Sequence, residues 1–161
     1  MRRFISGLWS QVLQPMLRRP PRRQVAALCW REGERGVEVL LISSRGTGRW
    51  ILPKGWPMRG KDLAGAALQE AWEEAGARFV ETPAVPVGRF ASLKVSDSGL
   101  PEPSEVMVFA AEVRELADDF PEQGQRRRRW AAPDEAAGLV EEAGLAELIR
   151  AFGRGRARPA R

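Results

Sequence analysis

The chain has 161 residues, a mass of 17.9 kDa and an ordinary hydrophobic content of 43%, which together predict one globular domain with a core of its own. It contains no histidine, no tyrosine and a single cysteine, Cys29, which excludes an internal disulfide, a histidine-based catalytic triad and a histidine metal site. A metal ion would have to be held by oxygen atoms, which favours Mg²⁺ or Mn²⁺ over Zn²⁺.

The net charge of +5 hides two basic ends and an acidic body. Six arginines and no acidic residue stand in the first 23 positions, and four arginines and no acidic residue stand in the last eight. Without these ten arginines the net charge changes from +5 to −5. Because the basic character is confined to the ends, the composition does not indicate specific binding of nucleic acid.

Residues 1–23 are expected to form a unit of their own. Apolar residues recur in pairs every four positions from Phe4 to Leu17, which predicts an N-terminal amphipathic helix, and the consecutive prolines that follow it predict a linker. The helix is too short and too interrupted for a transmembrane span, and it lacks the features of a secretory signal. Its apolar stripe is expected to pack on the body of the protein or on a second copy, while contact with a membrane surface stays an alternative. The sequence leaves the oligomeric state open.

Two strands open the body of the chain. The segments from Gln24 to Trp30 and from Val37 to Ser43 have strand character, and a hairpin-like turn joins them. The polar loop over 43–49 follows, with hydroxyl groups, glycines and two arginines. Such a loop is typical either of a plain connection or of a contact with phosphate groups.

The central feature of the sequence is a helix that carries three clustered glutamates. A short apolar strand over 50–52 leads through a turn rich in proline and glycine into a predicted helix from Leu63 to Ala75. On this helix Glu70, Glu73 and Glu74 lie at positions i, i+3 and i+4, so that their carboxylates share one face. Like charges at this spacing repel, and no lysine or arginine follows within one turn, which is typical of a helix that binds a cation. An ordinary solvated acidic face is the alternative.

The stretch 55–77 resembles the Nudix box, whose pattern is G-x5-E-x7-R-E-U-x-E-E-x-G-U, with U a bulky aliphatic residue. It departs from this pattern at Lys61 and Gln69, where the family has Glu and Arg. The resemblance implies an α/β fold of the Nudix type, in which a mixed β-sheet lies between helices in an α/β/α arrangement. It also implies a divalent metal ion held by the three carboxylates and by one backbone carbonyl of the turn. The matching positions are Gly55, Glu70, Glu73, Glu74 and Gly76, and the expected metal ligands are Gly55, Glu70, Glu73 and Glu74.

The second half of the chain continues with strands. Arg78 to Val80 and Val87 to Val95 have strand character, and Ser96 to Ser104 is expected to be a loop. The strongly apolar stretch from Val106 to Val113 predicts a central strand of the sheet.

The last third of the chain begins with four arginines, 126–129. This run is typical of a solvated surface or an edge strand, but in a protein that binds polyphosphates it could instead line the pocket. A helix is expected from Pro133 to Glu142, ended by Gly144, and a last amphipathic turn or two from Leu145 to Phe152. The residues after Phe152 are expected to be disordered.

A second resemblance is to diphosphoinositol polyphosphate phosphohydrolases. It covers about residues 24–142, with an interruption between 95 and 125, and rests on the stretch AALCWREGERGVEVLLISSRGTGRWILPKGW and on the Arg-Arg-Trp sequence at 128–130. These proteins have Gly where this chain has Lys54, so the lysine would add a positive charge at the catalytic turn. By this resemblance Ser44, Arg45 and Arg128 are expected to contact substrate phosphates, and Lys54 is expected to join them because of its charge.

The three helix glutamates are the predicted catalytic residues. Water that attacks a phosphoanhydride must approach an anionic group, and a divalent cation relieves this by screening charge and lowering the pKa of a bound water. Glu70 and Glu74, one turn apart, are expected to hold the ion, with Glu73 as the third ligand. One of these carboxylates, or Glu102 or Glu105 from the later loop, would deprotonate the water.

The sequence therefore predicts three parts: the N-terminal helix and linker over 1–23, a Nudix hydrolase domain over 24–152 and a disordered basic tail over 153–161. The predicted function is Mg²⁺- or Mn²⁺-dependent hydrolysis of a small polyphosphate, of the diadenosine polyphosphate or inositol pyrophosphate type, with ADP-ribose as another candidate. A box-degenerate module that binds a nucleotide without cleaving it is the alternative, suggested by Lys61 and Gln69. Without a disulfide or a targeting segment, the cytoplasm is the expected compartment.

Overall fold

A computed structural model describes residues 21–81, 83–95 and 99–157 of the chain. The expected N-terminal helix and the last four residues of the chain lie outside the described residues. No helix within the described ranges is long and apolar enough to cross a membrane. In chain order the elements are β1 (Arg22–Gly33), β2 (Gly36–Ser43), β3 (Trp50–Ile51), β4 (Lys54–Gly55), α3 (Leu63–Ala75), β5 (Ala77–Phe79), β6 (Val85–Val95), β7 (Pro101–Leu116), β8 (Arg128–Ala131), α4 (Pro133–Leu139) and α5 (Ala143–Arg156).

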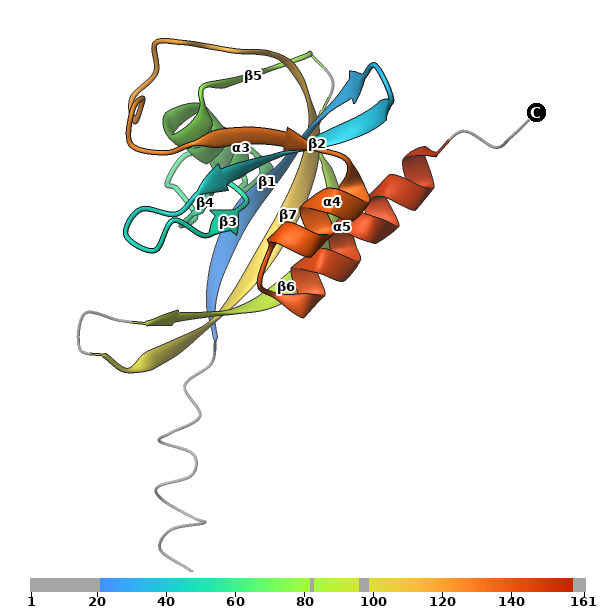
Figure 1. Ribbon diagram of the computed structural model, residues 1–161. Coiled ribbons are helices and arrows are strands. Elements are labelled where there is room, and N and C mark those ends of the chain that lie inside the picture. The colour runs from blue at the N-terminus through green and yellow to red at the C-terminus, as the bar shows by residue number, and fades with distance from the viewer. Residues whose placement is uncertain (1–20, 82, 96–98, 158–161) are drawn as a thin grey trace, which may run out of the picture.

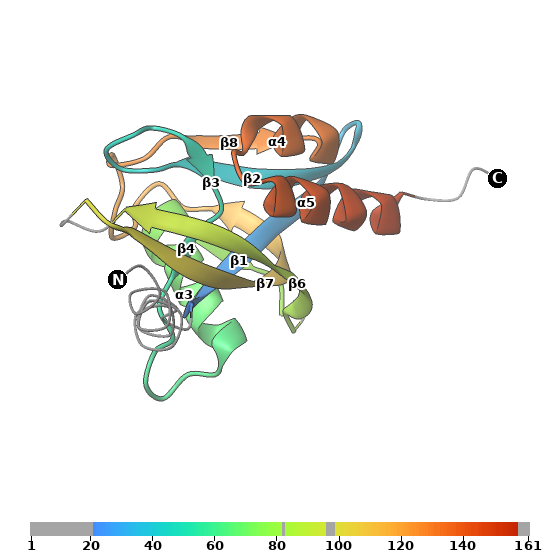
Figure 2. The ribbon, with the colours of Figure 1, turned by 90° about the horizontal axis from the view of Figure 1, so that it is seen from below.

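The strands form a mixed sheet in the order β3-β2-β1-β7-β5, to which β4 adds on β1, β6 on β7 and β8 on β2. β1 and β7 run parallel from the pair Arg22 and Ser104 to the pair Trp30 and Glu112, and the other described pairs are antiparallel. Helix α3 covers one face of the sheet, and α4 and α5 cover the other (Figures 1 and 2). The predicted α/β/α arrangement of a mixed sheet between helices is confirmed.

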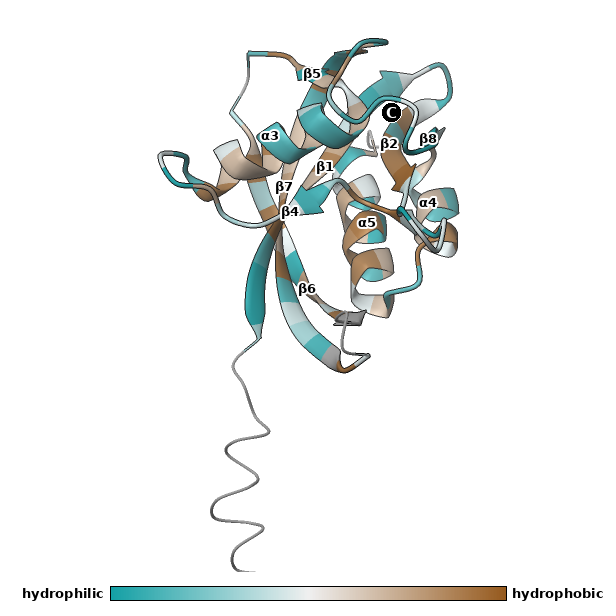
Figure 3. Ribbon diagram, turned by 90° about the vertical axis from the view of Figure 1, so that its left-hand side faces the viewer, coloured by the Kyte–Doolittle hydropathy of each residue, from teal (hydrophilic) through white to brown (hydrophobic). Residues whose placement is uncertain are grey.

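The two faces of β1 supply both hydrophobic cores, because successive side chains of a strand point to opposite sides of the sheet. A strand that is buried on both faces has a continuous apolar sequence, and residues 25–30 of β1 are such a sequence. Each helix contributes apolar residues to the core on its own side of the sheet, among them Ala71 of α3, Ala136 of α4 and Leu145 of α5 (Figure 3 colours the ribbon by hydropathy). Val25, Ala27 and Cys29 join the core under α3, and Ala26, Leu28 and Trp30 join the core under α4 and α5.

The hairpin of β6 and β7 is longer than its sequence predicts. The stretch 96–104 was expected to be a loop because it contains a glycine and two prolines, but β7 begins at Pro101. The ladder between β6 and β7 continues to the pair of Val95 and Pro101, and Ser104 is also paired with β1. Cross-strand pairing on both sides therefore outweighs the local turn signals.

The C-terminal helices also differ from the prediction. Helix α4 ends at Leu139, earlier than expected, and Gly144 does not break a helix but lies in the first turn of α5. Helix α5 continues to Arg156, so that 153–156, expected in the disordered tail, are helical. The glycine that opens this range leaves room for Pro133, whose side chain a Cβ there would overlap. Packing of α5 against α4 outweighs the low helix propensity of glycine.

Helix α3 begins and ends where its capping residues predict. The side chain of Asp62 accepts a hydrogen bond from the backbone N–H of Gly65 at 2.7 Å. At the other end Gly76 has a positive φ of 68° and donates its N–H to the carbonyl of Trp72 at 2.9 Å. A Cβ on Gly76 would overlap the ring of Phe120, so both backbone conformation and packing require glycine at this position.

We expect the substitution Gly76→Ala to lower the free energy of unfolding by about 1–3 kcal/mol, because alanine is strained in the left-handed region and its Cβ meets Phe120. The matched control is Gly138→Ala, in helix α4, where a Cβ meets nothing within 4 Å. It should leave stability unchanged or raise it by up to about 1 kcal/mol. Urea unfolding followed by tryptophan fluorescence measures both, and equal stability of the two variants would contradict this role of Gly76.

Candidate active site

The turn before α3 lies against the helix because β4 pairs with β1. Val25 and Ala26 of β1 are paired with Gly55 and Lys54, which brings the turn beside the glutamates of α3. A Cβ on Gly55 would overlap the carboxyl group of Glu70. Only glycine at this position allows the Glu70 carboxyl to reach the turn, which explains in steric terms why the turn needs it.

Glu74 is the most buried of the three helix glutamates, with 7% of its surface exposed. One carboxylate oxygen, Oε2, accepts a hydrogen bond from the backbone N–H of Lys54 at 3.2 Å. The other oxygen, Oε1, lies 3.4 Å from the guanidinium nitrogen Nη2 of Arg126. Both partners of this ion pair are almost fully buried, so it forms away from bulk water.

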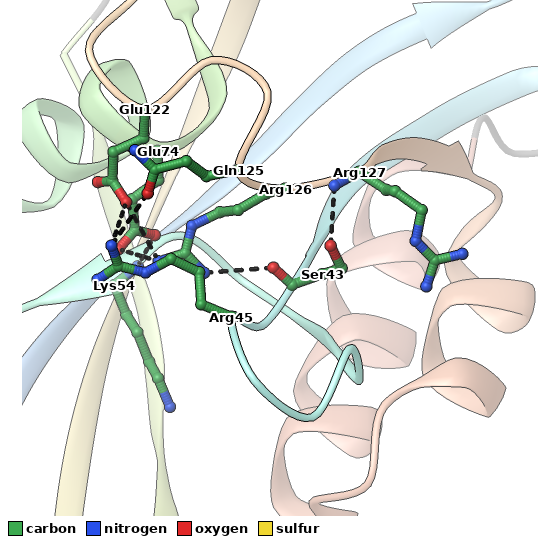
Figure 4. Close-up of polar contacts among 8 residues, drawn as sticks. All are labelled: Ser43, Arg45, Lys54, Glu74, Glu122, Gln125, Arg126 and Arg127. Carbon is green, nitrogen blue, oxygen red and sulfur yellow. Dashed lines mark hydrogen bonds and ion pairs between the residues drawn. The ribbon is translucent and has the colours of Figure 1, made fainter.

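A fourth carboxylate, that of Glu122, joins the cluster from the loop between β7 and β8. The Glu122 oxygen Oε1 lies 3.5 Å from Nη2 of Arg126, so one guanidinium nitrogen faces both Glu74 and Glu122 (Figure 4). The backbone N–H of Glu122 donates to the carbonyl of Glu73 at 3.0 Å, which attaches the loop to α3. Arg126 is further held by a hydrogen bond from Nη1 to the carbonyl of Ser43 at 3.2 Å.

The sequence pattern did not identify Glu122, and it pointed to two other glutamates instead. Glu102 lies 3.7 Å from Arg22, and Glu105 lies 3.2 Å from Arg89, both on the long hairpin of β6 and β7. Only the spacing between Glu122 and Arg126, four residues apart in a polar loop, could have suggested that they act together.

The pKa values of two helix carboxyls are raised. Burial raises the pKa of Glu74 to about 7, against the opposing effects of Arg126 and of the Lys54 N–H, with a further increase from Glu70 and Glu122. Burial also raises the pKa of Glu70 to about 6, with additional repulsion from Glu73 and Glu122. Burial and mutual repulsion together therefore outweigh the stabilisation of the ionised carboxylates by Arg126. Such groups bind protons or cations more readily than exposed carboxylates do.

The four-arginine run divides between two directions, since side chains alternate along an extended chain. Arg126 reaches the carboxylates, and Arg127 instead stacks over Trp50 at 4.8 Å. Nη1 of Arg128 donates to two backbone carbonyls, that of Ala75 at the end of α3 at 3.0 Å and that of Ala117 just after β7 at 2.8 Å. Arg128 thus braces the structure, and its predicted contact with substrate stays a prediction.

The loop after β2 brings the other predicted phosphate-binding residues towards the cluster. Nη1 of Arg45 lies 3.6 Å from Oε1 of Glu122 and donates to the side-chain oxygen of Gln125 at 3.0 Å. The Ser44 hydroxyl lies 2.6 Å from that of Thr47 and accepts from a backbone N–H, so it shapes the loop. Lys54 contributes its backbone N–H, while its side chain points away from the carboxylates in Figure 4.

The chemistry of the cluster fits a hard divalent cation. Its donors are carboxylate oxygens, buried and with raised pKa values, and Oε1 of Glu122 is buried without a hydrogen-bond partner. The carboxylates surround a guanidinium rather than forming a closed coordination shell, and the described part of the chain contains no group of three or more acidic or cysteine side chains in such a shell. Arg126 supplies the counter-charge in this arrangement.

Comparison with known proteins agrees with this geometry. The family description of the NUDIX domain matches residues 20–152. The chain is 32% identical over 123 residues to diphosphoinositol polyphosphate phosphohydrolase 3-alpha of Mus musculus, across 74% of this chain and 70% of that protein. The fold is similar to that of the C. elegans Ap4A hydrolase, with a TM-score of 0.61, 20% identity, and coverage of 85% of this chain and 99% of that one. It is also similar to the NUDIX domain of Shewanella oneidensis NrtR complexed with ADP ribose, with a TM-score of 0.60, 15% identity, and coverage of 92% and 97%.

In the presence of a chelator, the free energy of unfolding should fall as pH rises from about 4.5 to about 7, relative to the variant Glu74→Gln. The folded-state pKa of Glu74 is raised, so the folded protein binds this proton more tightly than the unfolded chain does, and that advantage disappears as the carboxyl ionises. The expected difference is about 2–3 kcal/mol over this interval. Urea unfolding at a series of pH values measures it, and parallel curves for the two proteins would contradict the raised pKa.

Replacing Arg126 by methionine should destabilise the metal-free protein by about 3–5 kcal/mol, because the buried carboxylates of Glu74 and Glu122 lose their counter-charge. Arg127→Met is the control. Its side chain is exposed and contacts Trp50 and the carbonyl of Gly48, so its loss should be about 1 kcal/mol or less. Chemical denaturation with chelator compares them, and equal losses would show that the buried ion pair has no special role.

Proposed function

Because the chain belongs to the NUDIX family, we propose that it is a hydrolase that uses Mg²⁺, or Mn²⁺, to cleave a phosphoanhydride bond in a small polyphosphate. The observation that carries this proposal is the convergence of Glu70, Glu74 and Glu122 on Arg126, beside a loop that holds Arg45. The named relatives are phosphohydrolases of diphosphoinositol polyphosphates, which supports polyphosphate as the substrate class.

We assign the cation to the carboxylates of Glu70, Glu73, Glu74 and Glu122, together with the carbonyl of Gly55. When bound, the ion would screen the charge of the phosphates and lower the pKa of a water molecule. The raised pKa values of Glu70 and Glu74 support this assignment, because carboxylates that are buried and lie close to one another gain more from a cation than exposed ones do.

Two arginines are suited to bind the phosphate groups. Arg45 is largely exposed, and Arg126 already lies between two carboxylates. Each planar guanidinium can present two N–H groups to phosphate oxygens. In this proposal Arg126 exchanges part of its contact with the carboxylates for contact with substrate phosphate, while its bond to the Ser43 carbonyl keeps it in position. Ser44 supports the loop, and Lys54 and Arg128 stay predicted phosphate contacts.

We propose Glu122 as the group that takes the proton from the attacking water. It comes from a loop rather than from α3, so it can approach the reacting phosphorus from another side than the helix carboxylates. Its oxygen Oε1 is buried and accepts no hydrogen bond from the described residues. The same oxygen lies 3.5 Å from Arg126 and 3.6 Å from Arg45, and once these guanidinium groups turn to substrate phosphate the carboxylate is suited to receive a proton.

The departures of this chain from the box pattern do not favour a binding module without activity. Nε2 of Gln69 donates a hydrogen bond to Oε1 of Glu73 at 3.1 Å, so this glutamine braces the adjacent carboxylate without the arginine of the family pattern. The second departure, Lys61, lies before the helix and outside the carboxylate cluster. We also propose a cytoplasmic location, because Cys29 is a free buried thiol.

The proposal predicts metal-dependent release of phosphate or nucleotide from at least one compound in a panel of diadenosine polyphosphates, inositol pyrophosphate, ADP-ribose and nucleoside triphosphates. Glu74→Gln and Glu122→Gln should each lower kcat/KM by about 10²–10⁴-fold, since they remove a metal ligand or the base. Glu102→Gln, which removes an exposed ion pair with Arg22, is the matched control and should keep wild-type activity.

Isothermal titration with Mn²⁺ gives a readout that does not depend on turnover. The variant Glu74→Gln should bind Mn²⁺ at least about 10-fold more weakly than the wild type, since it loses a charged ligand. If the wild type hydrolyses none of the panel in Mg²⁺ or Mn²⁺ while still binding a nucleotide, the hydrolase proposal fails and the binding-module alternative takes its place.

A further inference from the structure

The loop between β7 and β8, residues 117–127, carries two groups of the proposed reaction. Glu122 is the group that takes the proton, and Arg126, 3.5 Å from it, is one of the two arginines that bind phosphate. Figure 1 shows the loop beside α3, although its residues belong to no helix or strand. A side chain on such a loop needs support from its neighbours, because a displacement of about 1 Å can lower a reaction rate about 10²-fold.

Phe120 attaches the first half of this loop to the end of α3. Its side chain is buried, with 9% of the residue exposed. The ring lies where a Cβ on Gly76 would be, and the guanidinium of Arg128 lies 5.0 Å from the ring centroid. The backbone N–H of Ala117 donates to the carbonyl of Gly76 at 2.8 Å, so the backbone before the ring is attached to the same glycine.

A tight turn connects Phe120 with Glu122. The backbone N–H of Gln123 donates to the carbonyl of Phe120 at 3.2 Å, and the backbone N–H of Phe120 donates to the side-chain oxygen of Gln123 at 3.2 Å. Glu122 lies inside this turn, and its own N–H is bound to the carbonyl of Glu73 at 3.0 Å. Because the turn is closed by these bonds, a shift of the Phe120 ring would move the Glu122 carboxylate relative to α3.

Ser43 attaches the other end of the loop to β2. It is a buried polar residue, with 6% of its surface exposed. Its hydroxyl accepts a hydrogen bond from the backbone N–H of Arg127 at 2.8 Å (Figure 4), and its own N–H donates to the carbonyl of Arg127 at 3.0 Å. Its carbonyl accepts the bond from Arg126. The hydroxyl thus holds the backbone next to Arg126, and without it a partly buried N–H would lose its partner.

We propose that Phe120 and Ser43 are positioning residues with separate tasks: Phe120 positions the Glu122 carboxylate, and Ser43 positions the Arg126 guanidinium. The inference rests on the proposed function, in which neither side chain touches the substrate. Loss of the two residues should have different kinetic effects. A displaced base slows the chemical step and lowers kcat, whereas a displaced guanidinium weakens the binding of phosphate and raises KM. A role in stability alone would not divide the two constants in this way.

The first test is steady-state kinetics of Phe120 variants at saturating Mg²⁺, with the compound of the panel that the wild type hydrolyses fastest. Phe120→Ala should lower kcat at least about 10-fold and change KM less than about 3-fold. Phe120→Leu keeps an apolar side chain beside Gly76 but not the flat ring, and should lower kcat by a smaller factor, about 3-fold, again without a change in KM. If Phe120→Ala does not fold, the leucine variant decides.

Phe152→Ala is the matched control for Phe120. The Phe152 ring also lies under a guanidinium, that of Arg156 at 5.6 Å, but it packs against the core under α4 and α5. This variant should keep the wild-type kcat and KM. A loss of kcat equal to that of Phe120→Ala would show that any buried ring of the domain has the same effect, and would overturn the role of Phe120.

The second test replaces Ser43. Ser43→Ala should raise KM about 10-fold and change kcat less than about 3-fold. Ser104→Ala is the matched control, because the Ser104 hydroxyl is also buried and donates to the carbonyl of Arg22 at 3.2 Å and to the side chain of Gln24 at 2.9 Å, on the hairpin of β6 and β7. It should leave both constants unchanged. If Ser43→Ala and Phe120→Ala changed kcat and KM in the same proportion, the separate tasks would be refuted.

Isothermal titration distinguishes this inference from the proposed function. Phe120→Ala should bind Mn²⁺ at least about 3-fold more weakly than the wild type, because Glu122 is an assigned ligand, and Ser43→Ala should bind it as the wild type does. A non-hydrolysable diadenosine tetraphosphate in saturating Mg²⁺ should give the reverse order, with about 10-fold weaker binding only in Ser43→Ala. These results in a protein that hydrolyses nothing would support the two positioning roles and reject the hydrolase. Hydrolysis by the wild type, with equal affinities in all three proteins, would overturn the positioning roles while the hydrolase stands.

Discussion

The buried contact of Arg126 with Glu74 and Glu122 is the interaction on which the site depends. Three carboxylates drawn into a partly desolvated space lose hydration and repel one another, and the pKa values of Glu70 and Glu74 are raised chiefly by burial and further by that repulsion. A single guanidinium reduces the repulsion without removing it. The folded protein can therefore form the site without a metal ion. A divalent cation and a phosphate chain would complete it.

The fold brings these groups together by the pairing of short strands. β4 pairs with β1 and brings the turn at Gly55 against α3, where the absent side chain admits the Glu70 carboxyl. β8 pairs with β2 and directs the loop that carries Arg126 towards the same place. The loop between β2 and β3 contacts the cluster through Arg45 and the junction of α4 and α5 through Arg49, so it links the cluster to the C-terminal helices.

The helix and its glutamates could be predicted from the sequence because their signals are local. Asp62 and Gly76 cap α3 as their residue types predict, and spacings of three and four residues place the carboxylates on one side. The partners of these carboxylates could not be predicted. Glu122 and Arg126 come from a loop whose path depends on β7 and β8, and no local pattern specifies which of several acidic residues in the later loops turns inward. The helical state of 153–156 was missed for a similar reason, since it depends on packing against Pro133.

The most direct test of the central claim is the position of the metal ion itself. Crystals grown with Mn²⁺ and a non-hydrolysable diadenosine polyphosphate should give an anomalous difference peak between the carboxylates of Glu70, Glu74 and Glu122, with Arg126 turned towards a phosphate group. An Mn²⁺ peak elsewhere, with the contact of Arg126 with Glu74 and Glu122 unchanged in the presence of ligand, would contradict this account of the site.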